Sequence, residues 1–285
     1  RLNSHLGIWA DPQTLRLACL SQRERVSLAR RTSLSPMGYS TSQRICDLVL
    51  RPRFLVGWVI AVALVRFVNL GFLDLQGWDE GLYALRSKSI VQFGDWMDQT
   101  PHVPGGLATS CYPPLTFWTT AAFYHLFGAS EWTTRLTSAL FGAGSVALIV
   151  LLVRRISSQS AALFGGILLG TNLFFTFFTR QGQLDVAYIF FLIFSTYGWL
   201  LWGEGTGKKR GLTLVALGTC GAFMSKILVG FYVPLILFVL LAVEMRQRWV
   251  WRRVFELSGA VIAGVLLALP WHVLMYLKHG QVFLD

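Results

Sequence analysis

Residues 135–153 read RLTSALFGAGSVALIVLLV, and two arginines, Arg154 and Arg155, follow directly. The stretch carries no charge after Arg135, and its length is close to the roughly 20 apolar residues that a helix needs to cross a bilayer. Other stretches of the chain have the same character. The sequence therefore predicts seven membrane-spanning helices, at 54–73, 135–153, 161–179, 186–202, 212–228, 231–245 and 255–272.

The composition of the whole chain also indicates a membrane protein. Of its 285 residues, 54% are hydrophobic and 14% charged, and the mean hydropathy is +0.54, whereas soluble domains average about 25% charged residues. The net charge of +11 does not indicate nucleic acid, because the basic residues form short clusters between apolar stretches. We expect an all-α polytopic membrane protein, with the bilayer as partner and no nucleic acid.

Residues 1–50 differ from the rest of the chain, because they are rich in Arg and Ser and lack a long apolar stretch. We expect a disordered or non-native N-terminal arm. A transit peptide is the alternative, since such peptides have a similar composition. The membrane domain then covers residues 51–285. The four cysteines are too scattered for a metal motif or a disulfide framework.

The segment 115–127 is apolar but too short to cross a bilayer, so we expect a helix that lies in the membrane interface. Charge supports this assignment. With the N-terminal arm in the cytoplasm, the basic clusters at 154–155, 208–210 and 246–253 all fall on the cytoplasmic side, as the positive-inside rule requires. The long segment 74–134 then lies outside.

The same orientation collects carboxylates from distant parts of the chain at the outer face. Asp79 and Glu80 follow the first predicted span, and Asp185 precedes a long apolar run. Carboxylates near membrane depth are costly and usually functional. Such a group is suited to accept a proton from a hydroxyl or to hold a metal ion. For Asp79 and Glu80, solvated loop carboxylates are the alternative.

Cations reach the outer face as well. Arg180 and Lys226 suit an anionic partner, with side chains that snorkel from span ends as the alternative. For Arg66, within the first span, we expect snorkelling. Four histidines, at 102, 125, 272 and 279, lack the close spacing of a metal-ligand set. The segment Tyr112-Pro113-Pro114 stiffens the start of the interfacial helix or simply punctuates it.

Seven short segments form an ordered set of motifs: 78–84 (WDEGLYA), 94–96 (GDW), 112–118 (YPPLTFW), 135–142 (RLTSALFG), 180–185 (RQGQLD), 225–226 (SK) and 270–272 (PWH). Together these motifs resemble the bacterial type-C (GT-C) glycosyltransferases of family 39. This family includes the aminoarabinose transferases and the dolichyl-phosphate-mannose protein mannosyltransferases. The resemblance covers about residues 54–285, the N-terminal part of such proteins, so we expect the C-terminal part of the family to be missing. Two departures stand out: Cys111-Tyr112 replaces an acidic-Lys pair, and Ile227 replaces a glycine.

The resemblance implies a GT-C-like bundle of transmembrane helices with an outer-face loop, 74–134, that carries interfacial helices. It also implies an inverting transferase in the inner or plasma membrane, with its active site on the periplasmic or extracellular side. The donor would be a polyprenyl-phosphate sugar, and the acceptor a hydroxyl of a lipid, glycan or protein. No cofactor is certain, although a divalent metal at Asp79 and Asp185 is possible.

The same resemblance suggests a role for each site residue. Asp79 would be the base, Glu80 its support, and Asp185 would orient the acceptor or a metal. Arg180 and Lys226 would bind the donor phosphate. The acceptor or its groove would be lined by Tyr112, Pro113, Pro114, Trp271 and His272.

Two other classes remain open. A lipid or small-anion transporter would also carry charges within its spans, but it predicts an inverted repeat and broken helices near the midplane. A non-catalytic scaffold would need no outer carboxylates.

Overall fold

The computed structural model describes residues 52–109, 112–205, 207–246 and 250–283, so the expected arm at 1–50 lies outside the described residues. These ranges contain helices and no strand, which confirms the all-α prediction. The α-helices are α3 (Pro52–Val65), α4 (Asp79–Phe93), α5 (Leu115–Phe127), α6 (Glu131–Ile156), α7 (Gln159–Thr171), α8 (Leu173–Thr179), α9 (Leu184–Gly203), α10 (Lys208–Phe223), α11 (Ile227–Gly230), α12 (Tyr232–Glu244) and α13 (Trp251–His279). The short 3-10 helices are η1 (Thr100–His102), η2 (Gly106–Thr109) and η3 (Gly280–Phe283).

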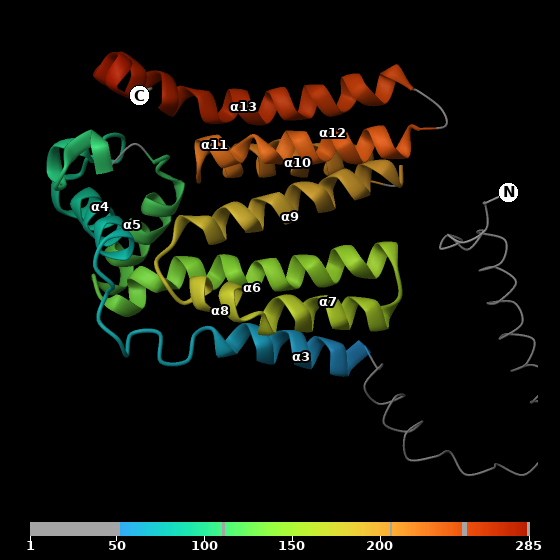
Figure 1. The fold of residues 1–285 in the computed structure, drawn as a ribbon, viewed down its shortest axis with the longest axis horizontal. Helices are drawn as coiled ribbons and strands as arrows, with labels where there is room; N and C mark the ends of the chain where they lie inside the picture. The colour runs from blue at the N-terminus through green and yellow to red at the C-terminus, as the bar shows by residue number, and fades with distance from the viewer. Residues whose placement is uncertain (1–51, 110–111, 206, 247–249, 284–285) are drawn as a thin grey trace, which may run out of the picture. The chain divides into compact units, whose positions relative to one another are not determined.

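The long helices run side by side, and α4 and α5 lie together at one end of the bundle, on the left in Figure 1. The α8–α9 turn, the start of α11 and the end of α13 lie at this same end, which we call the α4–α5 end. The α6–α7, α9–α10 and α12–α13 connections lie at the opposite end. Residues that are far apart in sequence therefore gather at the α4–α5 end.

Each of the seven predicted spans coincides with helical structure, but not every one forms a single long helix. Within the described ranges, four helical segments are long and apolar enough to cross a membrane: Glu131–Ile156, Leu184–Gly203, Ile227–Glu244 and Trp251–Phe283. A fifth counts if α7 and α8, bent by 63° at Asn172, form one broken span. Helices α3 and α10 are shorter, so the number of crossings stays a prediction. Helix α5 begins and ends where the short apolar segment does.

Helices α9 and α10 pack closely because glycines line their contact. A Cβ at Gly211 would lie 2.5 Å from the backbone nitrogen of Trp202, and one at Gly218 would lie 2.1 Å from Ser195 Oγ. Both distances are shorter than a real contact, so these positions leave no room for a larger residue. In a bilayer the hydrophobic effect does not drive helices together, and small residues at their contacts let the backbones pack closely.

The prediction that Arg66 snorkels toward the interface is wrong, because its side chain is 1% exposed. Its guanidinium donates to the carbonyls of Val62 (2.6 Å) and Gly170 (3.1 Å) and lies 5.4 Å from the ring centre of Phe175. Helix α7 ends at Thr171, and the last carbonyls of a helix lack partners within it. Arg66 supplies a donor to one of them, which explains why it turns inward.

Candidate active site

The carboxylate of Glu80 is buried and fully engaged at the start of α4. Arg135, in the second turn of α6, donates to both of its oxygens, from Nε at 2.8 Å and from Nη2 at 3.0 Å. The backbone N–H groups of Gln76 (2.8 Å) and Gly182 (2.9 Å) donate to the same two oxygens. Glu80 therefore connects the segment before α4, the start of α6 and the α8–α9 turn.

Arg135 is as fully engaged as its partner. Its remaining N–H groups donate to the carbonyls of Leu70 (2.9 Å), Leu73 (2.7 Å) and Asp74 (2.9 Å), so all five donors of the guanidinium are used. Burial alone would raise the pKa of Glu80, but the hydrogen bonds from Arg135, Gln76 and Gly182 outweigh it and hold the pKa below its usual value. Glu80 is thus a fixed anion that holds the site together and has no oxygen to spare for a proton.

Asp79 has the opposite environment, although it is the adjacent residue. It is exposed at the first position of α4, where the positive end of the helix dipole favours a carboxylate. Trp78, directly before it, has φ 73° and ψ −119°, a region that costs a non-glycine residue on the order of 1–3 kcal/mol. The two neighbours of Asp79, the fixed Glu80 and the strained Trp78, therefore set the direction of its side chain.

Asp185 and Lys226 meet at the same end of the bundle. Lys226 Nζ lies 2.8 Å from Asp185 Oδ1, which joins the first turn of α9 to the residue before α11. The side chains keep 46% and 31% of their surface exposed, for Asp185 and Lys226 respectively. This ion pair is open to a ligand, unlike the pair of Glu80 and Arg135.

Tyr83 lies near both exposed carboxylates. It follows Asp79 by one turn of α4, and it belongs to the same buried cluster as Leu184, the residue before Asp185. Its ring packs edge-on against that of Tyr112, with ring centres 5.7 Å apart. Burial raises the pKa of Tyr83 well above its usual value, and Tyr112, Asp79 and Asp185 add to this effect. Asp79 and Asp185 therefore both come near one buried tyrosine.

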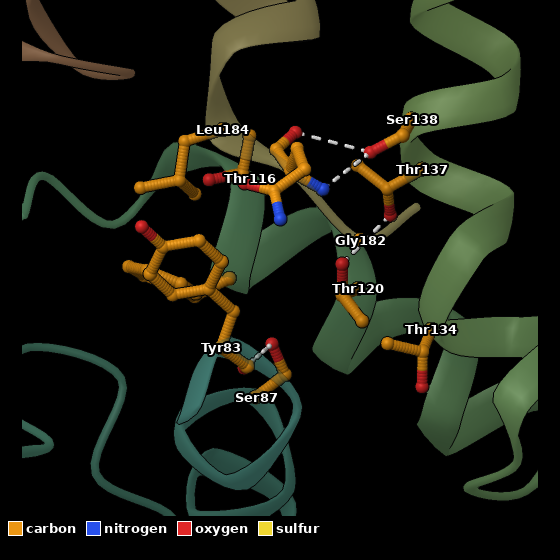
Figure 2. Close-up of a pocket in the computed structure, with 11 residues that line it drawn as sticks. Tyr83, Ser87, Thr116, Thr120, Thr134, Thr137, Ser138, Gly182 and Leu184 are labelled. Carbon is orange, nitrogen blue, oxygen red and sulfur yellow. Dashed lines mark hydrogen bonds between the residues drawn. The ribbon is translucent and has the colours of Figure 1, made fainter. Parts of the chain in front are cut away.

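A small hydroxyl-lined cavity lies beside Tyr83, where α4, α5, α6 and the α8–α9 turn meet (Figure 2). Thr120 of α5 and Thr137 of α6 share a hydrogen bond of 2.8 Å. Ser138 exchanges hydrogen bonds with the backbone of Gln183, at 3.0 and 3.1 Å. The cavity, about 10 Å³, is close to the space that one water needs. These contacts fasten the site to α6.

A larger cavity of about 510 Å³ opens between α9, α10 and α13, and its lining is almost entirely apolar. Met224, which lines it, is two residues from Lys226. The indole N–H of Trp118 donates to the carbonyl of Trp96 (2.5 Å), and that of Trp271 donates to the carbonyl of Met97 (2.9 Å). Both tryptophans thus hold segment 95–99 beside the apolar cavity.

Arg180 lies in a different place from Lys226, although the sequence suggested one role for both. Its Nη1 donates to the carbonyls of Val65 (3.0 Å) and Arg66 (3.3 Å). It lines a separate cavity of about 420 Å³ between the segment after α3, the start of α6 and the α8–α9 turn. The structure therefore brings Lys226 together with Asp185, and Arg180 together with the surroundings of Arg135.

The other predicted residues lie at the start of α5 and near the end of α13. Tyr112 is half-buried beside Tyr83, while Pro113 and Pro114 are buried at the start of α5. Trp271 lines the apolar cavity. His272 is half-buried, and its Nδ1 lies 3.0 Å from the carbonyl of Ala268.

Sequence reasoning did not single out two groups that matter here. One is Arg135, the partner of Glu80. The other is Asp98, whose buried carboxylate lies 2.6 Å from Lys278 Nζ and 2.9 Å from His279 Nε2, and so ties segment 95–99 to the end of α13. The sequence does contain a signal for Arg135, because a charge at the first residue of an apolar run is costly and usually functional.

The described residues contain no group of three or more His, Cys, Asp or Glu side chains that could hold a metal ion. Asp185 is moreover already paired with Lys226. A metal at Asp79 and Asp185 stays a prediction.

Comparisons with known proteins show the family and the fold. The pattern of the dolichyl-phosphate-mannose-protein mannosyltransferase family matches residues 112–272. An uncharacterized protein of Aquifex aeolicus is 30% identical over 232 residues, which are 80% of this chain and 44% of that protein. The undecaprenyl phosphate-alpha-4-amino-4-deoxy-L-arabinose arabinosyl transferase of Serratia proteamaculans is 28% identical over 225 residues, 75% of this chain and 39% of that protein.

A solved structure gives the same picture. The crystal structure of ArnT from Cupriavidus metallidurans bound to undecaprenyl phosphate matches with a TM-score of 0.70 and 25% identity, over 82% of this chain and 44% of that one. Fold and site thus define a multi-pass membrane protein of the GT-C fold. The chain belongs to the dolichyl-phosphate-mannose-protein mannosyltransferase family, which confirms the predicted resemblance. It spans less than half the length of each of these relatives.

Proposed function

We propose that the complete protein is a membrane glycosyltransferase that moves a sugar from a polyprenyl phosphate to a hydroxyl of a lipid, glycan or protein acceptor. One observation carries the proposal: two accessible carboxylates, Asp79 and Asp185, come near the same buried tyrosine, Tyr83, and Asp185 is paired with a cation. The relatives support the donor class, since the ArnT crystal structure holds undecaprenyl phosphate and the Serratia protein is named as an arabinosyl transferase.

The reaction is a displacement at the anomeric carbon. The acceptor oxygen forms a bond to this carbon as the bond from the carbon to the phosphate oxygen breaks, so the configuration inverts. The electron pair of the broken bond stays on the polyprenyl phosphate, and the hydroxyl proton passes to Asp79. Glu80 cannot take this proton, because its two oxygens already accept four hydrogen bonds. Asp185 orients the acceptor hydroxyl.

Lys226 is the cation that we assign to the departing phosphate. Negative charge grows on that phosphate in the transition state, and a fixed cation beside it lowers the barrier. The apolar cavity starts two residues away, at Met224, so it has the place and the lining that a polyprenyl chain needs. The Lys226 ammonium has three donors and shares one contact with Asp185, so it has donors left for a phosphate.

We place the reaction at the outer face of the inner or plasma membrane. The α4–α5 end carries Asp79 and Asp185, while the basic clusters of α6, α10 and α13 lie at the opposite end of the bundle (Figure 1). Lys and Arg concentrate on the cytoplasmic side of membrane proteins. This distribution favours an outward-facing site.

The test is Asp79→Asn in the complete protein, supplied with a radiolabelled polyprenyl-phosphate sugar. Loss of a general base reduces transfer by about 10²- to 10⁴-fold. Because Asp79 is exposed, the thermal midpoint in detergent should not change. Glu131→Gln is the matched control, since it removes a carboxylate from the first turn of α6 at the same end, and transfer should persist.

The same assay separates this proposal from a lipid or small-anion transporter. Label that moves onto a new acceptor supports a transferase. Label that crosses a vesicle unchanged, or full activity in Asp79→Asn, would refute the assignment.

A further inference from the structure

We propose that the cavity at Arg180 binds the phosphate of a membrane lipid headgroup, at a site separate from the donor phosphate site at Lys226. The cavity measures about 420 Å³ and shares no lining residue with the apolar cavity near Lys226. It lies where α3 ends and α8 turns into α9, at the α4–α5 end of the bundle (Figure 1).

Arg180 supplies the donors for this site. Only its Nη1 is engaged, by the carbonyls of Val65 and Arg66. Among the described residues, Nε and Nη2 have no hydrogen-bond partner, and the side chain is only half-buried. These two nitrogens form one edge of the guanidinium fork, the geometry that grips two phosphate oxygens at once. The two carbonyls hold the arginine in place and leave this edge available.

The neighbouring arginine explains why Arg180 has to act alone. Arg135 also lines the cavity, but all five of its donors are used by Glu80 and by three carbonyls. Its charge is balanced by the carboxylate of Glu80. It therefore forms a rigid wall and does not compete for the ligand.

The rest of the lining suits a polar headgroup. Asn69, Gln76 and Gln181 contribute amides. Gln181 is 7% exposed, and within the described ranges its side chain has no hydrogen-bond partner. The carboxylate of Asp74 also borders the cavity. It disfavours a bare anion and favours a phosphate ester that carries its own hydroxyl or amine donors.

The apolar part of the lining indicates that the ligand is a lipid. Leu73 is 66% exposed and Phe177 is 50% exposed, and both line the cavity. A cavity that combines a guanidinium edge and amides with exposed apolar side chains fits an amphiphile, whose headgroup meets the polar groups and whose chains meet the apolar ones. A free anion would gain nothing from these two side chains.

The test is retention of lipid by the purified chain in native mass spectrometry. The protein is released from mixed micelles that contain equal amounts of phosphatidylglycerol and phosphatidylcholine with the same acyl chains. We expect selective retention of phosphatidylglycerol. Arg180→Gln should reduce that retention by about tenfold or more. Arg180→Lys keeps the charge but loses the fork, so its retention of phosphatidylglycerol should lie between that of wild type and that of Arg180→Gln. This second variant also controls for misfolding of Arg180→Gln.

Two controls locate the effect. Arg155→Gln removes an arginine paired with Glu204 at the opposite end and should retain phosphatidylglycerol. Lys226→Gln should retain phosphatidylglycerol too, while it loses undecaprenyl phosphate. No step of this test measures sugar transfer, so its result is independent of the proposed reaction.

Equal retention of the two lipids, or equal retention by wild type and both Arg180 variants, would overturn the proposal. Displacement of phosphatidylglycerol by inorganic phosphate at matched concentration would also overturn it, because the ligand would then be a free anion.

Discussion

Two ion pairs at the α4–α5 end have the same chemistry and opposite surroundings. The side chains of Glu80 and Arg135 are 0% and 6% exposed, and their polar atoms are saturated with hydrogen bonds. Those of Asp185 and Lys226 are 46% and 31% exposed and share one contact of 2.8 Å. A buried, saturated pair can only hold structure together. An open pair can exchange its partner for a ligand.

The comparison separates the two neighbouring acids as well. Asp79 and Glu80 differ by one position, yet the first is exposed and the second has four donors. In a helix, adjacent residues point in directions about 100° apart. One of them can therefore face the bundle while the other faces the site, and the fixed Glu80 sets the position of Asp79.

The largest effect is expected for Arg135→Met, which breaks the buried pair. Loss of one partner of such a pair costs about 3–5 kcal/mol, because the remaining charge stays buried and unpaired. The free energy of unfolding in mixed micelles, followed by circular dichroism, measures this loss.

The double variant Glu80→Gln with Arg135→Met is the control for that experiment. It removes both charges, so it should recover part of the lost stability. If Arg135→Met cost less than about 1 kcal/mol, the pair would not be buried as the structure shows, and the contrast between the two pairs would fail.

A smaller effect is expected at Asp98, which is buried but belongs to the segment that follows α4. Burial alone would raise its pKa, but hydrogen bonds from Lys278, Thr100 and His279 outweigh burial and hold the pKa below its usual value. A carboxyl with a lowered pKa stabilises the fold above its unfolded pKa, and this contribution is lost as the pH falls through the folded value. Asp98→Asn should therefore cost about 1.5–3 kcal/mol at neutral pH.

The pH series tests the sign of that prediction. The stability difference between wild type and Asp98→Asn should stay constant from pH 7 to about pH 5, and should shrink below about pH 4, where the unfolded carboxyl takes up its proton. A difference that grew on acidification would contradict the role of Asp98 as a buried anion.

Hydrophobicity predicted the helices well because a bilayer demands long apolar stretches. It did not predict where they break. The run 161–179 is continuous in hydropathy, yet it bends by 63° at Asn172, whose side chain accepts from Phe175 N–H and starts α8. Nor did it predict the inward orientation of Arg66. Its side chain binds the carbonyl of Gly170, which lies at the end of α7 and 104 residues away in the sequence.

The sequence predicted which residues gather at one end of the bundle, but not how they are connected. Topology alone placed Asp79, Asp185 and Lys226 at one end. Which acid is buried depends on Arg135, 55 residues after Glu80, and such pairings are set by tertiary packing. The dependence on tertiary packing also explains Arg180. The sequence suggests that Arg180 is a cation for phosphate, but only the fold shows that it lines a cavity away from Lys226.

The smallest effect on stability, and the sharpest test of the comparison, is expected for Lys226→Gln. Exposed ion pairs contribute about 0–1 kcal/mol, so the unfolding free energy should hardly change. Binding of undecaprenyl phosphate, measured by isothermal titration in detergent, should weaken by about tenfold, since a charge-assisted contact to the phosphate is lost. Lys209→Gln, an exposed lysine at the opposite end, removes the same charge and should leave binding intact. If Lys226→Gln instead unfolded the protein and kept its affinity, the open pair would be structural, and the distinction between the two pairs would be lost.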